Sequence, residues 1–91
     1  MDVYRKSHKE HWLRDKDADG RILLLEDGSG WEIVLSDRPK TSRWLRISTI
    51  IVEDPKQKGH YLLNNITEAE MAQANYLGDA SDKVTIPNEA A

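Results

Sequence analysis

Apolar residues occur in short runs along the first two thirds of the chain, and polar turns separate these runs. Residues 22–26 form one run in which the first four residues are apolar, and in residues 31–35 the positions of one face are all apolar. Between them lie residues 27–30, Asp-Gly-Ser-Gly, whose residue types tolerate the backbone angles of tight turns. The two runs are therefore predicted to pair as an antiparallel β-hairpin.

The same signals predict three further strands. A short strand near residues 11–15 is followed by an Asp-Ala-Asp-Gly turn at 17–20. Residues 44–53 alternate and then run together as Ile-Ile-Val, which predicts the longest strand. Residues 60–64 are predicted to return antiparallel to it. Residues 36–42, which contain Asp, Pro and Ser, are predicted to form an exposed loop.

The segment after residue 66 carries two conflicting patterns. Thr67 and Glu70 have the spacing of a helix capping box, and good helix formers follow them. Apolar residues at alternate positions from Ala72 to Tyr76 are instead typical of a strand that would cover an exposed sheet edge. We favour a short helix or helical turn that packs over the open end of the barrel.

Together these elements predict a mainly all-β fold, a small five-stranded antiparallel barrel of SH3-like or OB-like type. Residues 1–10 are predicted to be a polar N-terminal arm, residues 11–78 the barrel domain, and residues 79–91 a flexible C-terminal tail. The predicted core residues are Trp31, Ile33, Leu35, Leu23, Leu25, Ile47, Ile51 and Leu62.

Length and composition limit the classes of function. Ninety-one residues make one domain with a modest core, which favours a binding module over a deep catalytic cleft. The chain has no cysteine, so it has no disulfide framework, thiolate metal site or thiol nucleophile. It also lacks an apolar signal core and a long apolar run. We therefore expect a cytoplasmic protein if Met1 is the native start.

Catalytic motifs are missing from the sequence. There is no nucleophile elbow and no glycine-rich phosphate loop, and most acidic residues fall in turns or on polar faces. His8 and His11 are three residues apart, but no third metal ligand has a matching spacing. The chain is predicted not to be an enzyme.

A basic segment around a tryptophan is the predicted binding site. Its five residues combine positive charge with one aromatic ring on a chain whose net charge is −3. We expect them to recognise a protein partner. Single-stranded nucleic acid is the alternative, since its binders combine cations with stacking rings. No membrane partner is predicted. The predicted binding residues are Arg38, Lys40, Arg43, Trp44 and Arg46.

An acidic segment matches a calcium-loop pattern, and it provides a second alternative function. Asp15, Asp17 and Asp19, followed by Gly20 and then by Glu26, have the spacing of an EF-hand loop. That site requires a helix after its last carboxylate, whereas the predicted hairpin turns at the next residue. We therefore predict no cofactor and keep Ca²⁺ as the alternative.

Several short motifs between residues 12 and 66 occur together in a spacing that resembles a known group. They are Asp19-Gly20, the apolar strand 22–25, Asp27-Gly-Ser-Gly-Trp-Glu-Ile33, Trp44-Leu45 and Tyr61-Leu-Leu-Asn-Asn65. In these motifs the chain resembles a group of small uncharacterised bacterial β-barrel proteins. The resemblance implies the barrel fold but no substrate or catalytic residue. Where that group continues Trp-Leu with Pro-Gly-Asp, this chain has Arg46-Ile-Ser48 and so a longer predicted strand.

Overall fold

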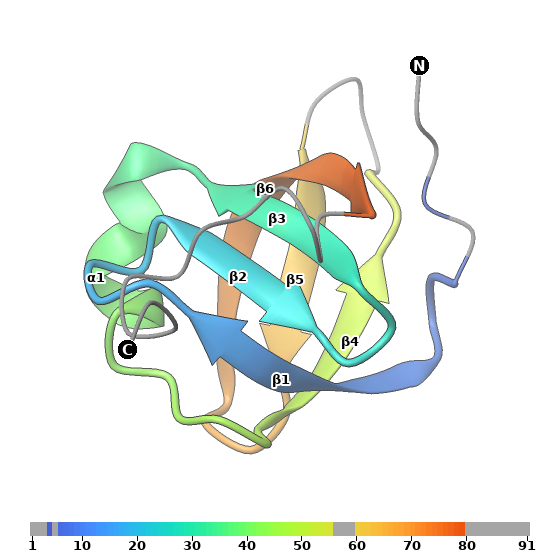
Figure 1. The fold of residues 1–91 in the computed structure, drawn as a ribbon, viewed down its shortest axis with the longest axis horizontal. Helices are drawn as coiled ribbons and strands as arrows, with labels where there is room; N and C mark the ends of the chain where they lie inside the picture. The colour runs from blue at the N-terminus through green and yellow to red at the C-terminus, as the bar shows by residue number, and fades with distance from the viewer. Residues whose placement is uncertain (1–3, 5, 56–59, 80–91) are drawn as a thin grey trace.

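A closed antiparallel barrel of six strands forms the protein (Figure 1). The computed structural model describes residues 4, 6–55 and 60–79. Around the barrel the strands follow the order β1-β2-β3-β6-β5-β4, and β4 pairs with β1 to close it. The strands are β1 (Glu10–Lys16), β2 (Ile22–Leu25), β3 (Ser29–Ile33), β4 (Thr49–Glu53), β5 (Tyr61–Asn65) and β6 (Glu70–Asp79).

The predicted β2–β3 hairpin is confirmed. Leu23 pairs with Trp31, and the Gly28 N–H closes the turn by donating to the Leu25 carbonyl over 3.0 Å. In the turn, the Asp27 carboxylate accepts hydrogen bonds from the Ser29 N–H and hydroxyl. The chain therefore doubles back directly after Glu26, as the turn chemistry predicts.

The five-strand prediction and the preferred C-terminal helix are both wrong. Residues 70–79 form β6, which pairs with β3 on one side and with β5 on the other. Without β6, both of those strands would expose an unpaired edge, and pairing both edges outweighs helix propensity. The two residues that suggested a helix cap have other partners: Thr67 accepts from the Thr49 N–H, and Glu70 accepts from the Trp44 indole N–H.

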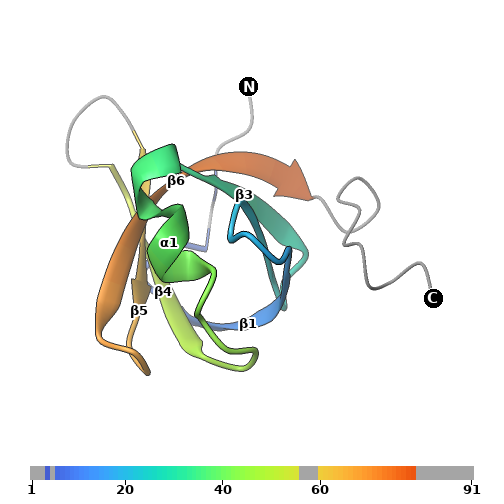
Figure 2. The ribbon, with the colours of Figure 1, turned by 90° about the vertical axis from the view of Figure 1, so that its left-hand side faces the viewer.

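Residues 36–41 of the predicted loop at 36–42 are helical. A 3₁₀ turn, η1 (Leu35–Asp37), leads into α1 (Arg38–Thr41), which has a proline in its first turn, where no N–H is needed. Figure 2 shows this pair lying across one end of the barrel. The Thr41 hydroxyl donates to the Gly20 carbonyl over 2.7 Å and so fastens α1 to the turn between β1 and β2.

The predicted strand 44–53 is too long, because only residues 49–53 form β4. In β4 and β5 the core residues are Ile50, Val52 and Leu63, one position away from the predicted Ile51 and Leu62, which are half-buried. A shift of one residue moves every side chain of a strand to the other face. The runs Ile-Ile-Val and Leu-Leu contain no alternation that would select the face.

The core prediction is right for four residues and wrong for two that lie outside the strands. Trp31, Ile33, Leu23 and Leu25 are fully buried, whereas Leu35 is 75% exposed and Ile47 is 77% exposed. Both exposed residues lie in turns, so strand alternation does not place them. The buried hydrophobic residues include Tyr4, Leu13, Leu23, Leu25, Trp31, Ile33, Trp44, Ile50, Val52 and Leu63.

The structure describes only parts of the predicted N-terminal arm and C-terminal tail. Tyr4, which falls in the predicted arm, is buried among Trp31, Tyr61 and Tyr76. At the other end, β6 continues to Asp79, and the rest of the predicted tail lies outside the described residues. Within the described part of the chain, no helix is long and apolar enough to cross a membrane.

Candidate functional site

Trp44, the aromatic residue of the predicted binding segment, belongs to the core. It is 1% exposed, and its indole N–H donates to the Glu70 carboxylate over 2.8 Å. Indole rings are commonly buried in this way, with their one donor satisfied. The Trp44 ring is therefore not available for stacking on a base or for contacting a partner in this conformation.

The cations of the predicted segment are bonded to the protein itself. Arg43 lies 3.7 Å from Glu70, and Arg46 lies 2.8 Å from Asp15. Lys40 donates to the Met71 carbonyl over 2.7 Å and lies 3.4 Å from Asp37, while Arg38 donates to the Ile33 carbonyl over 2.9 Å. These bonds orient each cation, although the Arg43 and Arg46 side chains stay 66% and 56% exposed. Three of these bonds link α1 and the following turn to strands of the barrel.

An exposed apolar surface lies next to this segment, on the outside of β1 and β4. Trp12 of β1 is 45% exposed and pairs with Thr49 of β4. The Ile66 N–H, at the end of β5, donates to the Thr49 carbonyl over 2.8 Å, so Ile66 lies on the other side of Thr49. Ile66 is 50% exposed. We call the surface formed by Trp12, Ile47, Thr49 and Ile66 the Trp12 face.

Ile47 has the most unusual backbone of this surface. Its φ is +63°, a left-handed conformation that a β-branched residue adopts only as an outlier. The neighbouring contacts enforce it: the Ile47 N–H donates to the Leu13 carbonyl over 2.8 Å, and the Ser48 hydroxyl donates to the Leu45 carbonyl over 2.6 Å. The result is a turn beside β1 that leaves Ile47 and Leu45 largely in solvent.

The four carboxylates of the calcium-loop pattern bind different partners. Asp15 accepts from Arg46, Asp17 and Asp19 accept from backbone N–H groups of their own turn, and Glu26 accepts from the Trp12 N–H over 2.9 Å. A strand follows Gly20 and a hairpin turn follows Glu26, so no helix presents the last carboxylate. Across residues 4, 6–55 and 60–79, no three His, Cys, Asp or Glu residues are grouped as they would be around a metal ion. The EF-hand geometry is therefore not formed.

A buried polar cluster that the sequence did not indicate joins the segment before β1 to the hairpin. The Tyr4 hydroxyl donates to Asp27 over 2.7 Å and lies 2.8 Å from His11 Nε2. His11 Nε2 also lies 3.0 Å from the Lys6 carbonyl, and its Nδ1 lies 3.1 Å from Glu26. Both ring nitrogens thus face acceptors, which favours the doubly protonated imidazole.

The charges in this cluster are mutually compensating. Burial opposes the charged imidazole, but the Lys6 carbonyl and the Glu26 carboxylate outweigh it and raise the pKa of His11. Burial also opposes the Asp27 carboxylate, but hydrogen bonds from Ser29 and Tyr4 outweigh it and lower the pKa of Asp27. Burial and the bond to Asp27 raise the pKa of Tyr4. The cluster therefore links the segment before β1 to the β2–β3 hairpin, and its polar groups bond to one another.

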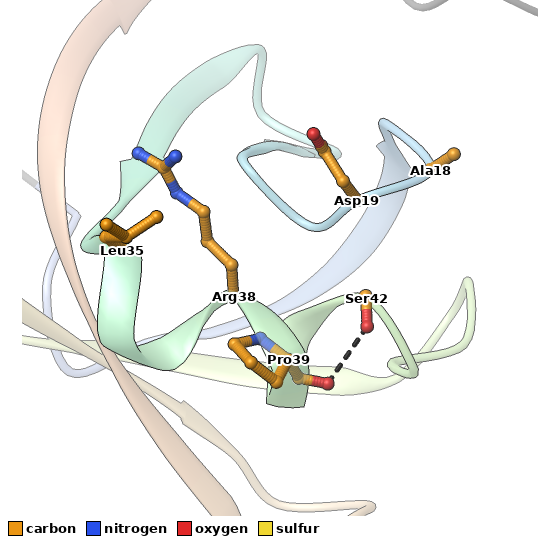
Figure 3. A pocket seen from close by; sticks show the side chains of 6 residues that line it. All are labelled: Ala18, Asp19, Leu35, Arg38, Pro39 and Ser42. Carbon is orange, nitrogen blue, oxygen red and sulfur yellow. Dashed lines mark hydrogen bonds between the residues drawn. The ribbon is translucent and has the colours of Figure 1, made fainter.

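An open hollow lies between the 17–21 turn and α1. Its volume is about 470 Å³, and Figure 3 shows Ala18 and Asp19 on one side with α1 and its neighbours on the other. Its lining has one cation, Arg38, and one exposed carboxylate, Asp19, but no paired nucleophile and base. The full lining is Ala18, Asp19, Leu35, Arg38, Pro39 and Ser42.

Comparison with known proteins provides no relative. The chain matches no family model, no curated protein and no solved structure.

One signal in the sequence could have indicated the Trp12 face. Trp12 and Leu13 are adjacent in a strand, so their side chains point to opposite sides of the sheet and one of them must face solvent. The exposure of Ile47 had no such signal, because no Gly, Pro or Asn marks the turn at residues 45–48.

Proposed function

We propose that this protein is a non-enzymatic recognition module that binds a protein partner through the Trp12 face. Leu45 and Arg46, from the predicted 38–46 segment, border that face. The site thus keeps one end of the segment predicted from sequence and replaces buried Trp44 with exposed Trp12.

The observation that carries the proposal is the strained and exposed Ile47. A left-handed non-glycine residue costs about 1–3 kcal/mol and persists where its surroundings enforce it, often at functional positions. Here the strain stabilises no core, because the Ile47 side chain is 77% exposed. Exposed Trp, Leu and Ile side chains beside each other are typical of protein-binding surfaces.

The closed barrel also restricts how a partner can bind. Each of the six described strands pairs with two neighbours around the closed barrel, so within the described residues no strand has a whole edge open to an added peptide strand. Recognition through outward side chains is the remaining mode. We keep the SH3-like or OB-like type as part of the proposal, by analogy with small barrels that bind ligands on their surface. The resemblance to small bacterial β-barrel proteins and a cytoplasmic location are likewise parts of it.

Site-specific photocrosslinking tests the proposal. A benzophenone side chain at position 47 should crosslink the chain to a discrete protein in native extract, and excess wild-type chain should compete while an Ile47→Asp variant should not. The matched control carries the same group at Gln73, which is exposed on β6. Identical crosslinking patterns from the two positions would show that the Trp12 face has no special affinity for protein.

Single-stranded nucleic acid has weaker support. The ring expected to stack, Trp44, is buried, and the nearby cations are bonded to acceptors of the chain. Titration with a short single strand at two salt concentrations separates the alternatives, since phosphate binding weakens steeply as salt rises. Salt-sensitive binding that requires Lys40 and Arg43 would favour nucleic acid over the proposed protein partner.

A further inference from the structure

The outward face of β1 has a charge pattern that is complementary to itself. Alternate residues of a strand point to the same side, and the outward residues of β1 are Glu10, Trp12 and Arg14, all exposed. The order along the strand is therefore negative, aromatic, positive. Within the described part of the chain, neither Glu10 nor Arg14 has an ion-pair partner.

Apolar residues of the neighbouring strand extend this pattern sideways. Ile51 of β4 pairs with Glu10, and Thr49 pairs with Trp12. The Ile47 N–H donates to the carbonyl of the Leu13–Arg14 peptide group, which places Ile47 beside the positive end of the row. A negative and a positive group thus border one apolar centre, four residues apart along β1, and the register of β1 shifts between Leu13 and Asp15, next to the positive group.

Two such faces fit each other when one copy is turned by 180° about an axis that crosses β1 at Trp12. This operation reverses the strand direction, so Glu10 of each copy lies opposite Arg14 of the other and the two Trp12 rings meet at the axis. It is the geometry of an isologous two-fold contact, in which one patch serves both subunits. We infer that the protein partner bound by the Trp12 face is a second copy of this chain.

This inference rests on the proposed function, because it names the partner of the same surface. An anionic membrane would also take up exposed Trp and Ile side chains, but the net charge of −3 and Glu10 beside Trp12 oppose binding to it. An unrelated protein would need its own charge pattern, whereas the second copy carries a matching one by symmetry.

Sedimentation velocity on the full chain over about a hundredfold range of concentration tests the inference. The expected result is a reversible rise from the monomer mass towards twice that mass. Glu10→Arg and Arg14→Glu should each weaken self-association by about tenfold, because each places like charges together at both symmetric contacts. The double variant should restore it, because swapping both charges recreates the same pairs.

The control is Lys6→Glu, which changes the net charge as Arg14→Glu does but lies outside the face and should leave self-association unchanged. Near-ultraviolet circular dichroism checks that each variant keeps the fold. A chain that stays monomeric throughout, or a dimer insensitive to the charge reversals, overturns the inference. So does binding to phosphatidylglycerol vesicles that depends on Trp12 while the protein remains monomeric.

The two proposals fail separately. If the position 47 probe captures another protein while the free chain is monomeric, the second-copy inference is wrong and the recognition function stands. If the chain dimerises through another surface and position 47 crosslinks nothing beyond its control, both are wrong.

Discussion

Replacing Ile47 with glycine or alanine isolates the backbone strain on which the proposed function depends. Both substitutions remove a side chain that is 77% exposed, so the small loss of burial largely cancels between them. What remains is the backbone. At a φ of +63°, a residue with a Cβ is strained by about 1–2 kcal/mol, and glycine is not. Glycine loses about 0.5–1 kcal/mol more through conformational entropy.

The difference of these two effects gives the expected result. Ile47→Gly should have a free energy of unfolding about 0.5–1 kcal/mol higher than Ile47→Ala. At Gln73, an exposed position of β6, the order should reverse, with Gln73→Gly less stable than Gln73→Ala. Urea unfolding followed by tryptophan fluorescence measures all four variants with one probe.

A particular outcome would refute the reasoning. If glycine is less stable than alanine at position 47 by the same amount as at position 73, then Ile47 is not held in a left-handed conformation in solution. The strain argument for the Trp12 face then disappears, whatever the crosslinking shows. Both Ile47 variants should also weaken binding, since each removes the exposed side chain. The expected signature of a strained recognition residue is that Ile47→Gly is more stable than Ile47→Ala although both variants bind more weakly than the wild type.

Three further outcomes follow from the described contacts. Gly20→Ala should lower the free energy of unfolding by about 3 kcal/mol. At a φ of +77° the new methyl group would lie 2.5 Å from Thr41 Oγ1, and it would displace the hydrogen bond that holds α1. Chemical denaturation measures the change, and Ala18→Gly in the same turn is the control. The pKa of His11 is raised in the folded state. Its contribution to stability is therefore complete below the pKa of the unfolded chain, near 6.5, and is lost as pH rises through the pKa of the folded state. The wild type should be less stable at alkaline pH than at mildly acidic pH. His11→Gln should flatten that slope, and an unchanged slope would place its origin elsewhere. Trp44→Ala should cost about 3–5 kcal/mol as a core truncation, so melting curves should show a destabilised fold before any binding assay on that variant is interpreted.

The hairpin at residues 22–33 could be predicted because its determinants are local. Its turn residues and the alternation of Trp31, Glu32 and Ile33 specify both pairing and face within a dozen positions. The inward face of β4 could not be predicted, because Ile50, Ile51 and Val52 are all apolar. Pairing with β1 decides which of these side chains point into the barrel. Local sequence therefore specifies the β2–β3 hairpin, whereas the inward face of β4 depends on its neighbouring strand.

The last strand shows tertiary structure overriding local preference. Residues 67–73 contain a capping pattern and good helix formers, but β3 and β5 both need a partner to close the barrel. The small side chains of Ala72 and Ala74, which favour a helix by propensity, are buried on the inner face of the barrel. The same residues fit a helix or a strand, and the open edges of β3 and β5 favour the strand.

The candidate site was partly predictable for a similar reason. Residue types indicated a charged and aromatic segment at 38–46, but they did not indicate which of its members would be used internally. Trp44 and Arg43 both bind Glu70, a residue of the strand that sequence reasoning had favoured as a helix. With that strand in place, the Trp44 ring is buried, whereas Trp12 and Ile47 are exposed.

The acidic calcium-like pattern has a physical explanation that leads back to this surface. Asp17 orders its turn by accepting from the Arg21 and Ile22 N–H groups, and Gly20 allows that turn to touch α1. Asp15 is buried and binds Arg46, which precedes Ile47. The carboxylate that would begin a calcium loop thus helps hold the turn that exposes Ile47. The acidic residues Asp15 and Asp17 and the glycine Gly20 thus each have a structural role around the β1–β2 connection that involves no metal ion.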